Sequence, residues 1–502
     1  DTRMQKYAEQ AATKQMRQVQ QNFRNHWGKE QPWRDEKGQL VPNFIENIAQ
    51  HLPVYKTLAE KFPNNPDSVE YYMNKPHKVR VFDYEKGSIE REMSTMDSIR
   101  YMVKFMHCSM VAMEPETGAV KAWVGDIDFN SWKYDKVTAM RQPGSTFKLF
   151  VYTEAMNQGL TPCDRRKDSY FAMKVWDPGK KKEVTWAPTN ANGYFTGDSM
   201  PLKAAFAQSI NSVAVKLGQE VGIANIARTA HDMGIKSKLD ETPSLPLGSS
   251  DVTLLELVNA YSTVVNDGKA HEPVLVIRIL DRDDKEIYVG PTEQRQAIPY
   301  KSAYLMQQML MGGLRERGGT SMSLWGYVGQ YDRDTDFGGK TGTSNNHSDA
   351  WFVGVSPKLI AGAWVGGEYR SIHFRTGALG QGSRTALPIC GYFLQQVLGD
   401  PAFKHYHGKF GKPKDDAIKE EMYLSCQYVY NRVDSDSIGV DSLGMTEIDE
   451  YIELDDEGNP VAKPAPSTTP QDDEASPATT TEPNTEATEK KKSKPQYEDV
   501  YL

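Results

Sequence analysis

The first 27 residues carry apolar side chains at roughly helical spacing, separated by charged and amide side chains. The apolar positions are Met4, Tyr7, Ala11, Met16, Val19, Phe23 and Trp27. Apolar residues that recur every three or four positions line one face of an α-helix. We therefore predict an amphipathic helix over residues 1 to about 27, packed on a neighbouring domain. From about residue 28 to 95, charges, prolines and short β-like runs alternate, which indicates a linker or a small subdomain.

A different pattern follows Ser145, where apolar residues run consecutively from Leu149 to Tyr152, after Phe147. Pro143-Gly144 signals a turn before this segment, and Gly159 is the residue type expected just past a helix end. We therefore predict a helix that begins at Ser145. Because this helix is apolar nearly all round, it should be buried inside a large domain.

Two apolar runs over residues 350–355 and 359–365 flank a short turn. This spacing is typical of a β-hairpin. Together with the segment that begins at Lys340, the runs predict an antiparallel meander whose first strand lies at or near a sheet edge. The glycines of residues 377–382 predict a flexible loop before a helix from about Thr385.

Composition excludes several classes of function. The chain has 502 residues, 38% of them hydrophobic, and a formal charge of −8. It has room for more than one folded unit, and its charge argues against nucleic acid as a partner. No run approaches the roughly 18 apolar residues of a membrane-spanning helix. The four cysteines lack Cys-x-x-Cys spacing, so we predict no metal site and no cofactor.

Ser145 and Lys148 form the first candidate reactive pair. A residue at a helix N-terminus lies beside unpaired backbone N–H groups and the positive end of the helix dipole, which favour negative charge on its side chain. Lys148 lies one turn away on the same face, so its amine can reach the hydroxyl. Burial lowers a lysine pKa, and a neutral amine can serve as the base for a serine nucleophile. The alternative is that Ser145 only caps the helix and Lys148 extends to water.

Two more polar clusters follow along the chain. Ser209-Ile210-Asn211 separates two helical runs, residues 202–208 and 213–217, where serine and asparagine can also act as a simple capping pair. Lys340-Thr341-Gly342-Thr343 begins the predicted edge strand and would present an ammonium and two hydroxyls on one face, with Gly342 allowing close approach to the backbone. The alternative is a polar edge strand protected by a lysine.

The order Ser-x-x-Lys, Ser-x-Asn, Lys-Thr-Gly is the signature of penicillin-binding proteins and serine β-lactamases. Over roughly residues 95 to 400 the chain resembles the transpeptidase domain of class A penicillin-binding proteins, the bifunctional cell-wall synthases. The likeness includes residues 109–125, the Arg141-Gln142-Pro143-Gly144 lead-in and residues 349–354. The first hundred residues more faintly resemble the connecting segment of the Bacteroidetes branch.

This resemblance implies an α/β (α+β) protein with the β-lactamase/D,D-peptidase-like transpeptidase fold. The expected architecture is a five-stranded antiparallel sheet flanked by helices, plus a helical subdomain, with the active site in the cleft between them. The expected parts of the chain are an N-terminal helix and linker or small subdomain over 1–95, the transpeptidase domain over 96–400, a C-terminal extension over 401–455 and a disordered low-complexity tail over 456–502.

The resemblance also implies a role for each candidate residue. Ser145 would be the acylated nucleophile, Lys148 its base, and Ser209 a proton relay to the leaving group. A second set would bind substrate, with the asparagine on an amide side chain and the strand residues on the terminal carboxylate of a D-Ala-D-Ala stem peptide: Asn211, Lys340, Thr341, Gly342 and Thr343. The backbone N–H groups of Ser145 and Thr343 would form the oxyanion hole.

The expected substrates are peptidoglycan stem peptides, a D-Ala-D-Ala donor and an amine acceptor, and β-lactam antibiotics are expected inhibitors. Envelope activator proteins are a further class of partner to consider. The resemblance implies a location at the periplasmic face of the inner membrane, with an anchor and a glycosyltransferase domain expected upstream of this chain. Such a location would allow a disulfide, for which Cys390 with Cys426 is one pairing, and buried free thiols are the alternative.

Two related functions compete with a D,D-transpeptidase. A class A β-lactamase needs a glutamate that activates the deacylating water, usually within Glu-x-x-x-Asn, and residues 212–339 contain no such motif. A β-lactam sensor usually follows a signalling segment with several membrane spans, whereas the long connecting region here fits a synthase better. We therefore favour the transpeptidase.

Overall fold

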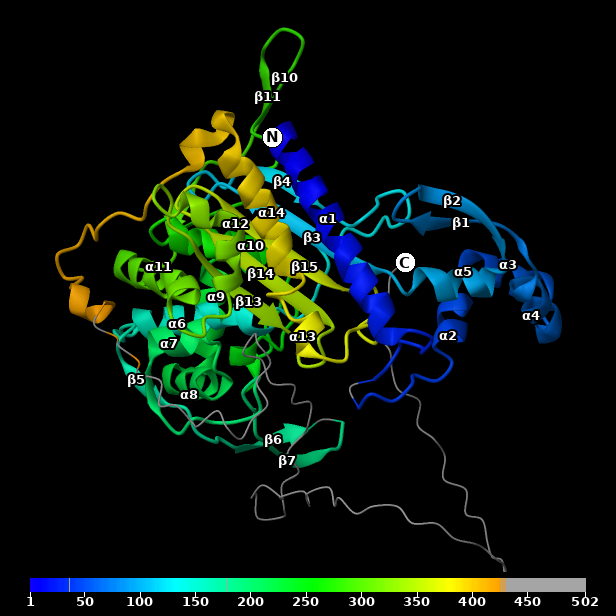
Figure 1. The fold of residues 1–502 in the computed structure, drawn as a ribbon, viewed down its shortest axis with the longest axis horizontal. Helices are drawn as coiled ribbons and strands as arrows, with labels where there is room; N and C mark the ends of the chain where they lie inside the picture. The colour runs from blue at the N-terminus through cyan, green and yellow to red at the C-terminus, as the bar shows by residue number, and fades with distance from the viewer. Residues whose placement is uncertain (36, 178, 425, 427, 429–502) are drawn as a thin grey trace, which may run out of the picture. The chain divides into compact units, whose positions relative to one another are not determined.

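A five-stranded antiparallel sheet forms the centre of the protein (Figure 1). The computed structural model describes residues 1–35, 37–177, 179–424, 426 and 428. The strand order is β13, β14, β15, β3, β4, with bounds Gly338–Thr343, Asp349–Val355, Ile360–Gly367, Met106–Met113 and Val120–Val124. The predicted hairpin is therefore confirmed as β14 and β15, and the strand that begins near Lys340 is an edge strand as predicted.

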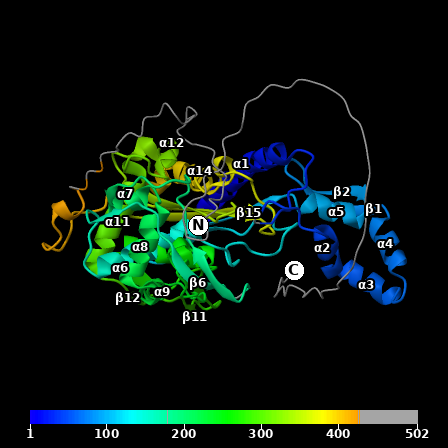
Figure 2. The same ribbon diagram turned by 90° about the horizontal axis from the view of Figure 1, so that it is seen from below.

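Helices cover both faces of this sheet (Figure 2). Alternate residues of the inner strands therefore belong to two different cores: Val111 of β3 lies in one and Met110 in the other. One core includes side chains from α6 (Lys148–Asn157), α8 (Asn211–Val221), α10 (Leu254–Val265) and α11 (Tyr300–Arg315). The other includes α1 (Thr2–Trp27) and α14 (Ala386–Gly399). Strands buried on both faces read as continuous apolar runs, which is why they were recognisable in the sequence.

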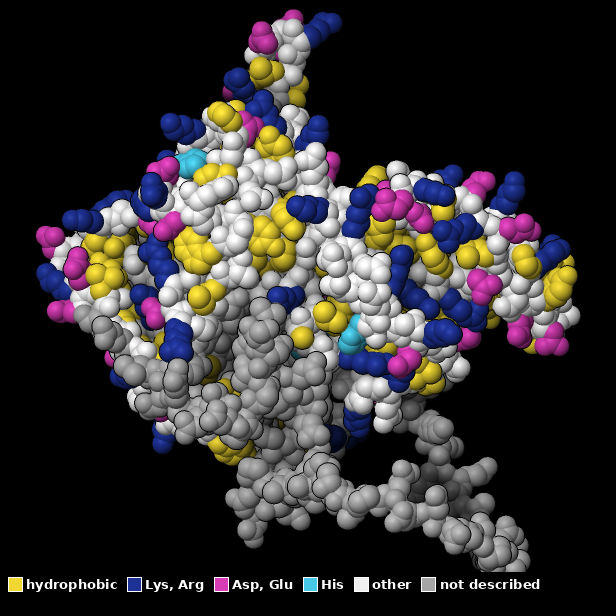
Figure 3. All heavy atoms as spheres, in the orientation of Figure 1, with side chains coloured by type: hydrophobic (Ala, Val, Ile, Leu, Met, Phe, Trp, Pro, Cys, Tyr) yellow, Lys and Arg dark blue, Asp and Glu magenta, His cyan; other side chains and the backbone are white. Residues whose placement is uncertain are grey.

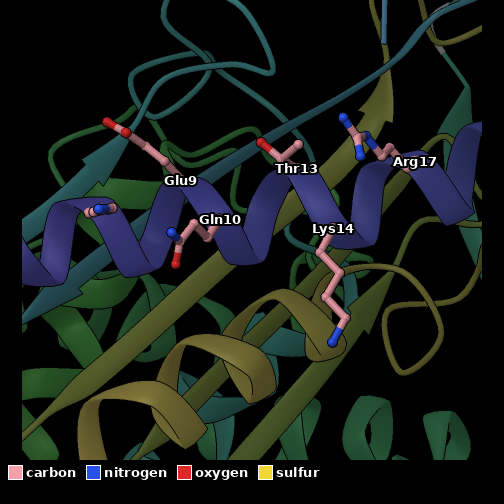
Figure 4. Close-up of a pocket in the computed structure, with 6 residues that line it drawn as sticks. Glu9, Gln10, Thr13, Lys14 and Arg17 are labelled. Carbon is pink, nitrogen blue, oxygen red and sulfur yellow. The ribbon is translucent and has the colours of Figure 1, made fainter. Parts of the chain in front are cut away.

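The predicted N-terminal helix is confirmed as α1, which packs on β3, β4 and α14. The apolar residues that predicted this helix are all buried except Tyr7, which is half-buried. Its opposite face is exposed and holds a shallow depression lined by Lys6, Glu9, Gln10, Thr13, Lys14 and Arg17 (Figure 4). This depression contains charged and amide side chains of an exposed helix face and no buried reactive group, so it is no candidate for catalysis.

The other elements surround the sheet or extend from it. Residues 28–105 form α2 (Phe44–His51), α3 (Pro53–Lys61), α4 (Pro66–Asn74), β1 (His77–Asp83), β2 (Gly87–Met93) and α5 (Thr95–Met102). The remaining strands are β5 (Arg165–Lys167), β6 (Met173–Asp177), β7 (Lys182–Trp186), β8 (Ser199–Pro201), β9 (Lys269–His271), β10 (Arg278–Leu280), β11 (Glu286–Val289) and β12 (Gln294–Gln296). The remaining helices are α7 (Leu202–Ala207), α9 (Ile223–Asp232), α12 (Trp325–Val328), α13 (Gly377–Gly380) and the short 3₁₀ helices η1 (Gly144–Phe147), η2 (Leu245–Leu247), η3 (Met322–Leu324), η4 (Gly329–Tyr331), η5 (Pro401–Tyr406) and η6 (Glu420–Met422).

Two sequence-based expectations are wrong. Cys426 forms a disulfide with Cys163 and not with Cys390, because Cys390 lies on the buried face of α14, where its thiol donates to the carbonyl of Ala361 at 3.4 Å. The expected loop at residues 377–382 instead begins as α13, which packs tightly: a Cβ on Gly380 would lie 2.9 Å from the Phe374 side chain.

Some expectations lie outside the described residues, namely the tail at 456–502 and most of the C-terminal extension. Among the described helices, none has the length and apolar character that crossing a bilayer requires. Acidic and basic side chains are interspersed over the face seen in Figure 3, so that face has no continuous basic surface.

The disulfide predicts a simple thiol count. If the protein is unfolded in denaturant without reductant and alkylated, two thiols should react, Cys108 and Cys390, and after reduction all four should react. Cys163→Ala with Cys426→Ala should lower the free energy of unfolding by roughly 2–4 kcal/mol, because the bridge closes a long loop in the unfolded chain. Four reactive thiols without reductant would contradict this pairing.

Candidate active site

Ser145 lies in a turn that is pressed against the edge strand β13. The turn is η1, which continues directly into α6. Gly144 has a φ of 52°, and a Cβ there would lie 2.5 Å from the carbonyl oxygen of Thr343, while a Cβ on Gly342 would lie 2.4 Å from the carbonyl oxygen of Pro143. Only glycines permit these two backbone approaches. They place the half-buried Ser145 beside β13, and its hydroxyl makes no hydrogen bond to another described residue.

Lys148 is fully buried in the first turn of α6, and its amine is held by the turn between α7 and α8. Its Nζ donates to the carbonyl oxygen of Ser209 at 2.6 Å and to Oδ1 of Asn211 at 2.7 Å, and it lies 3.3 Å from Oγ of Ser209. Burial, and secondly the positive charge of Lys340, hold the pKa of Lys148 well below its ordinary value. The surroundings of Lys148 therefore favour loss of its proton relative to an exposed lysine.

A neutral amine has two N–H donors and one lone pair. In Lys148 the two shortest hydrogen bonds go to a backbone carbonyl and an amide oxygen, which only accept. When Lys148 is neutral, its lone pair is thus left to accept a proton from a hydroxyl. The hydroxyl that the structure places beside it is that of Ser209, at 3.3 Å, and Ser145 precedes Lys148 by three residues.

Ser209 is held in a backbone conformation that is unusual for a serine. Its φ is 62°, in the left-handed region, where a residue other than glycine is strained by roughly 1–2 kcal/mol. The strain arises because Ser209 ends α7: its N–H donates to Phe206, and the next N–H donates to Ala205 at 2.9 Å. Residues held this way cluster at functional sites, where the surroundings fix them.

Lys340 contacts the same serine from the edge strand β13. Its Nζ donates to Oγ of Ser209 at 2.9 Å and to the carbonyl oxygen of Thr341 at 3.1 Å. Burial lowers the pKa of Lys340 to about 7. No carboxylate of the described residues lies within 4.0 Å of Lys340 or Lys148. Two buried lysines therefore meet at one hydroxyl without a neighbouring anion.

The two threonines of the third cluster do not lie on the same face of β13 as the lysine, so the expectation of an ammonium and two hydroxyls on one face is wrong. Lys340 pairs with Val353 and Thr341 with Phe352, and these two partners belong to opposite cores. The hydroxyl of Thr341 donates to Thr320 at 2.7 Å. The hydroxyl of Thr343 accepts from the backbone N–H of Gly382 at 3.2 Å. Both faces of β13 can border the site because β13 is an edge strand.

Two residues that the sequence did not select complete the surroundings of Asn211. The side-chain Nδ2 of Asn211 donates to the carbonyl oxygen of Thr189 at 2.8 Å, and its backbone N–H donates to Oδ1 of Asn190 at 3.0 Å. These residues lie in a stretch with proline, asparagine and glycine that indicates only a loop. No spacing in the sequence connects this loop to the second cluster.

A separate group of His107, Asp126 and Glu368 could in principle hold a metal ion, since one ligand atom from each lies within 4.8 Å of the others. The buried ammonium of Lys136, however, lies 2.7 Å from Glu368 and 3.9 Å from Asp126. A positive charge is thus already provided by the chain. We interpret this group as an ion-pair network and not as a metal centre.

Comparison with known proteins identifies both folded segments. Residues 108–365 match the penicillin-binding protein transpeptidase domain, and residues 28–106 match the penicillin-binding protein middle domain. The chain is 34% identical over 258 residues to penicillin-binding protein 2D of Bacillus subtilis, covering 51% of this chain and 36% of that protein. It is 32% identical over 316 residues to penicillin-binding protein 1A of Rickettsia prowazekii, covering 58% of this chain and 38% of that protein. The chain thus spans little more than a third of these relatives.

Solved structures agree with the fold. Penicillin-binding protein 1A from Haemophilus influenzae superposes with a TM-score of 0.59 at 19% identity, over 82% of this chain and 67% of that chain. The penicillin-binding protein PonA1 from Mycobacterium tuberculosis superposes with a TM-score of 0.50 at 22% identity, over 62% of this chain and 81% of that chain. The predicted five-stranded antiparallel sheet flanked by helices is therefore confirmed.

The buried state of Lys340 predicts a specific dependence of stability on pH. The unfolded chain holds this proton up to its ordinary pKa of 10.5, whereas the folded protein releases it near 7, so wild-type stability rises with pH between these values. One proton corresponds to at most about 1.4 kcal/mol per pH unit. Lys340→Met lacks this titration. Its stability relative to wild type, measured by denaturant unfolding, should therefore fall by roughly 2–3 kcal/mol from pH 7.5 to 9.5.

The matched control is Lys238→Met, whose side chain is 91% exposed. Its stability relative to wild type should stay constant over the same range. A constant difference for Lys340→Met as well would contradict a folded pKa near 7.

Proposed function

The chain belongs to the penicillin-binding protein transpeptidase family, serine-type transpeptidases of peptidoglycan synthesis and targets of β-lactams, and from this premise we propose that Ser145 forms the acyl-enzyme with a stem peptide. The observation that carries the proposal is the meeting of Lys148, Ser209 and Lys340 beside the turn that holds Ser145. The reaction is cross-linking of peptidoglycan: the D-Ala-D-Ala bond of one stem peptide is exchanged for a bond to the amine of another.

Acylation uses the lone pair of Lys148. As Oγ of Ser145 adds to the carbonyl carbon of the penultimate D-Ala, its proton passes to the neutral amine. The carbon–nitrogen bond then breaks, and the departing nitrogen of the terminal D-Ala must gain a proton. Ser209 lies 3.3 Å from Lys148, so it can return the proton to this leaving group. In the second half-reaction the acceptor amine attacks the ester, and the same groups work in reverse.

Lys340 is assigned to the terminal carboxylate of the donor, together with Thr341, Gly342 and Thr343. A buried ammonium without an anionic partner is suited to receive a carboxylate, because the ligand supplies the missing charge. Asn211 is assigned to an amide side chain of the substrate. The backbone N–H groups of Ser145 and Thr343 are assigned to the oxyanion, where a single donor contributes roughly 2.7–4 kcal/mol.

A serine β-lactamase and a β-lactam sensor remain the alternative functions. Both would be acylated at Ser145, so they differ in the fate of the acyl-enzyme. The lack of a Glu-x-x-x-Asn motif in residues 212–339 favours slow hydrolysis, as a transpeptidase requires. The penicillin-binding protein middle domain at 28–106 favours a synthase over a sensor.

Family membership places the protein in the cell envelope. We further propose a position at the periplasmic face of the inner membrane and a bifunctional parent with a glycosyltransferase domain, on the strength of the penicillin-binding protein 1A relatives. The division at residues 95, 400 and 455 belongs to the same proposal, and so does the possibility that envelope proteins activate the enzyme.

The first test is labelling with a fluorescent penicillin followed by intact mass and peptide mapping. We expect one label per chain, on Ser145, that persists for longer than acylation takes. Ser145→Ala should abolish it, whereas Ser323→Ala, a change at an exposed serine, should leave it unchanged. Labelling that survives in Ser145→Ala would overturn the assignment of the nucleophile, and rapid loss of the label would favour a β-lactamase.

The second test concerns the carboxylate. A charge-assisted hydrogen bond contributes roughly 1.5–3 kcal/mol, which corresponds to about ten- to more than a hundredfold in acylation efficiency. Lys340→Met should therefore lose about this factor with a β-lactam that bears the free carboxylate, and much less with its methyl ester. The measurement is the second-order acylation rate constant for both ligands on both proteins. Equal losses would mean that Lys340 acts on the fold or the field of the site and not on the carboxylate.

A further inference from the structure

The helix that begins with Asn211 lacks a cap of its own. The residue before α8 is Ile210, whose side chain cannot accept a hydrogen bond, so the first N–H groups of the helix need an acceptor from elsewhere. Asn190 supplies it from a distant loop. Its Oδ1 accepts the N–H of Asn211 at 3.0 Å and the N–H of Ser212 at 3.1 Å.

The orientation of Asn190 is fixed by the carboxylate of Asp168 together with a backbone carbonyl. Nδ2 of Asn190 donates to Oδ1 of Asp168 at 2.8 Å and to the carbonyl oxygen of Tyr194 at 3.0 Å, so the amide oxygen must face α8. Asp168 is fully buried, and it accepts further hydrogen bonds from the Ser212 hydroxyl at 2.6 Å and from the Thr196 N–H and hydroxyl at 2.9 and 3.0 Å. A buried carboxylate requires such partners, because an unpaired one is very costly. The buried Asp168 carboxylate therefore helps to hold the Asn190 amide in one orientation.

The same loop also holds the side chain of Asn211. The carbonyl oxygen of Thr189 accepts a hydrogen bond from Nδ2 of Asn211 at 2.8 Å, and Oδ1 of Asn211 accepts one from Nζ of Lys148 at 2.7 Å. Thr189 thus holds the side chain of Asn211, and Asn190 holds its backbone. Because Asn211 follows the strained Ser209 by two positions, these hydrogen bonds also restrain the turn that presents Ser209 to both lysines.

We propose that Asn190 is a positioning residue for acylation, and that Asp168 acts through it by fixing its amide, so that Asn211 and Lys148 keep the geometry that the reaction needs. This inference rests on the proposed function of Ser145. It adds the loop of residues 187–196 to the reaction machinery, although that loop contributes no reacting atom.

The test is an exchange of donor and acceptor. Asn190→Asp keeps the cap but turns a carboxylate oxygen toward the Asp168 carboxylate and the Tyr194 carbonyl. Asp168→Asn must turn its amide nitrogen either toward Asn190 or toward the Thr196 N–H, so it loses one of these two hydrogen bonds. The double variant Asp168→Asn with Asn190→Asp restores the pair, since the new amide can donate to the new carboxylate while the Ser212 hydroxyl rotates to accept. Each single variant should lose roughly ten- to a hundredfold in the rate of acylation at saturating penicillin, with little change in the dissociation constant of the first complex. The double variant should acylate at least about twofold faster than Asn190→Asp but stay below wild type, because its new carboxylate still faces the Tyr194 carbonyl.

Thr196→Val is the matched control, because it removes another hydrogen bond of Asp168 without touching α8. The thermal stability of Thr196→Val should be similar to that of the single variants, whereas its acylation rate should stay near that of wild type. The double variant keeps the hydrogen bond between residues 168 and 190, so it remains informative if a single variant does not fold.

Three results would overturn the inference: single variants that acylate like wild type, a folded double variant that does not recover, or losses that merely follow thermal stability across all four variants. Wild-type protein that is not labelled at Ser145 would instead refute the proposed function. The two failures are therefore distinguishable.

Discussion

Two buried lysines that share one hydroxyl constrain everything else in this site. Lys148 and Lys340 both lie near Ser209, and neither has a carboxylate of the described residues within 4.0 Å. Two ammonium groups this close cannot both keep their protons in a buried site. Burial lowers the pKa of both lysines, and the positive charge of Lys340 lowers that of Lys148 further. The fold must provide this burial, and it does so at a cost in stability that no ion pair with a described residue offsets.

The sheet and its glycines allow the backbone of β13 to pack closely against the turn that holds Ser145. A buried lysine needs dense packing around it, and the edge strand β13 can reach the serine turn only where side chains are absent. Gly342 and Gly144 remove the side chains at the two points where the backbones meet. A third approach follows the same logic, since a Cβ on Gly248 would lie 2.2 Å from the carbonyl oxygen of Gly144. Ser145 is thus positioned by backbone contacts on two sides, and its own side chain makes no hydrogen bond to another described residue.

The sequence predicted the parts of this arrangement that depend on local pattern. The α1 stripe, the buried α6 helix and the β14–β15 hairpin all follow from apolar spacing. It did not predict contacts between segments distant in the chain. Cys163 meets Cys426 across 263 residues, and no spacing distinguishes that pair from Cys390 with Cys426. Asn190 and Asp168 were missed for the same reason: each lies in a loop, and only the folded chain brings them to the start of α8.

The protonation states also give the proton path a direction. A hydroxyl has one proton, and a charged ammonium can only donate. When Lys340 is charged, it donates to Oγ of Ser209, so the hydrogen of Ser209 must point elsewhere, and Nζ of Lys148 lies 3.3 Å away. Under the proposed function, with Lys148 neutral, the hydrogen bonds would run from Lys340 through Ser209 to Lys148. A ligand carboxylate that drew Lys340 away would then weaken this donation and free Ser209 to accept, and carboxylate binding and proton transfer would be coupled through a single oxygen atom.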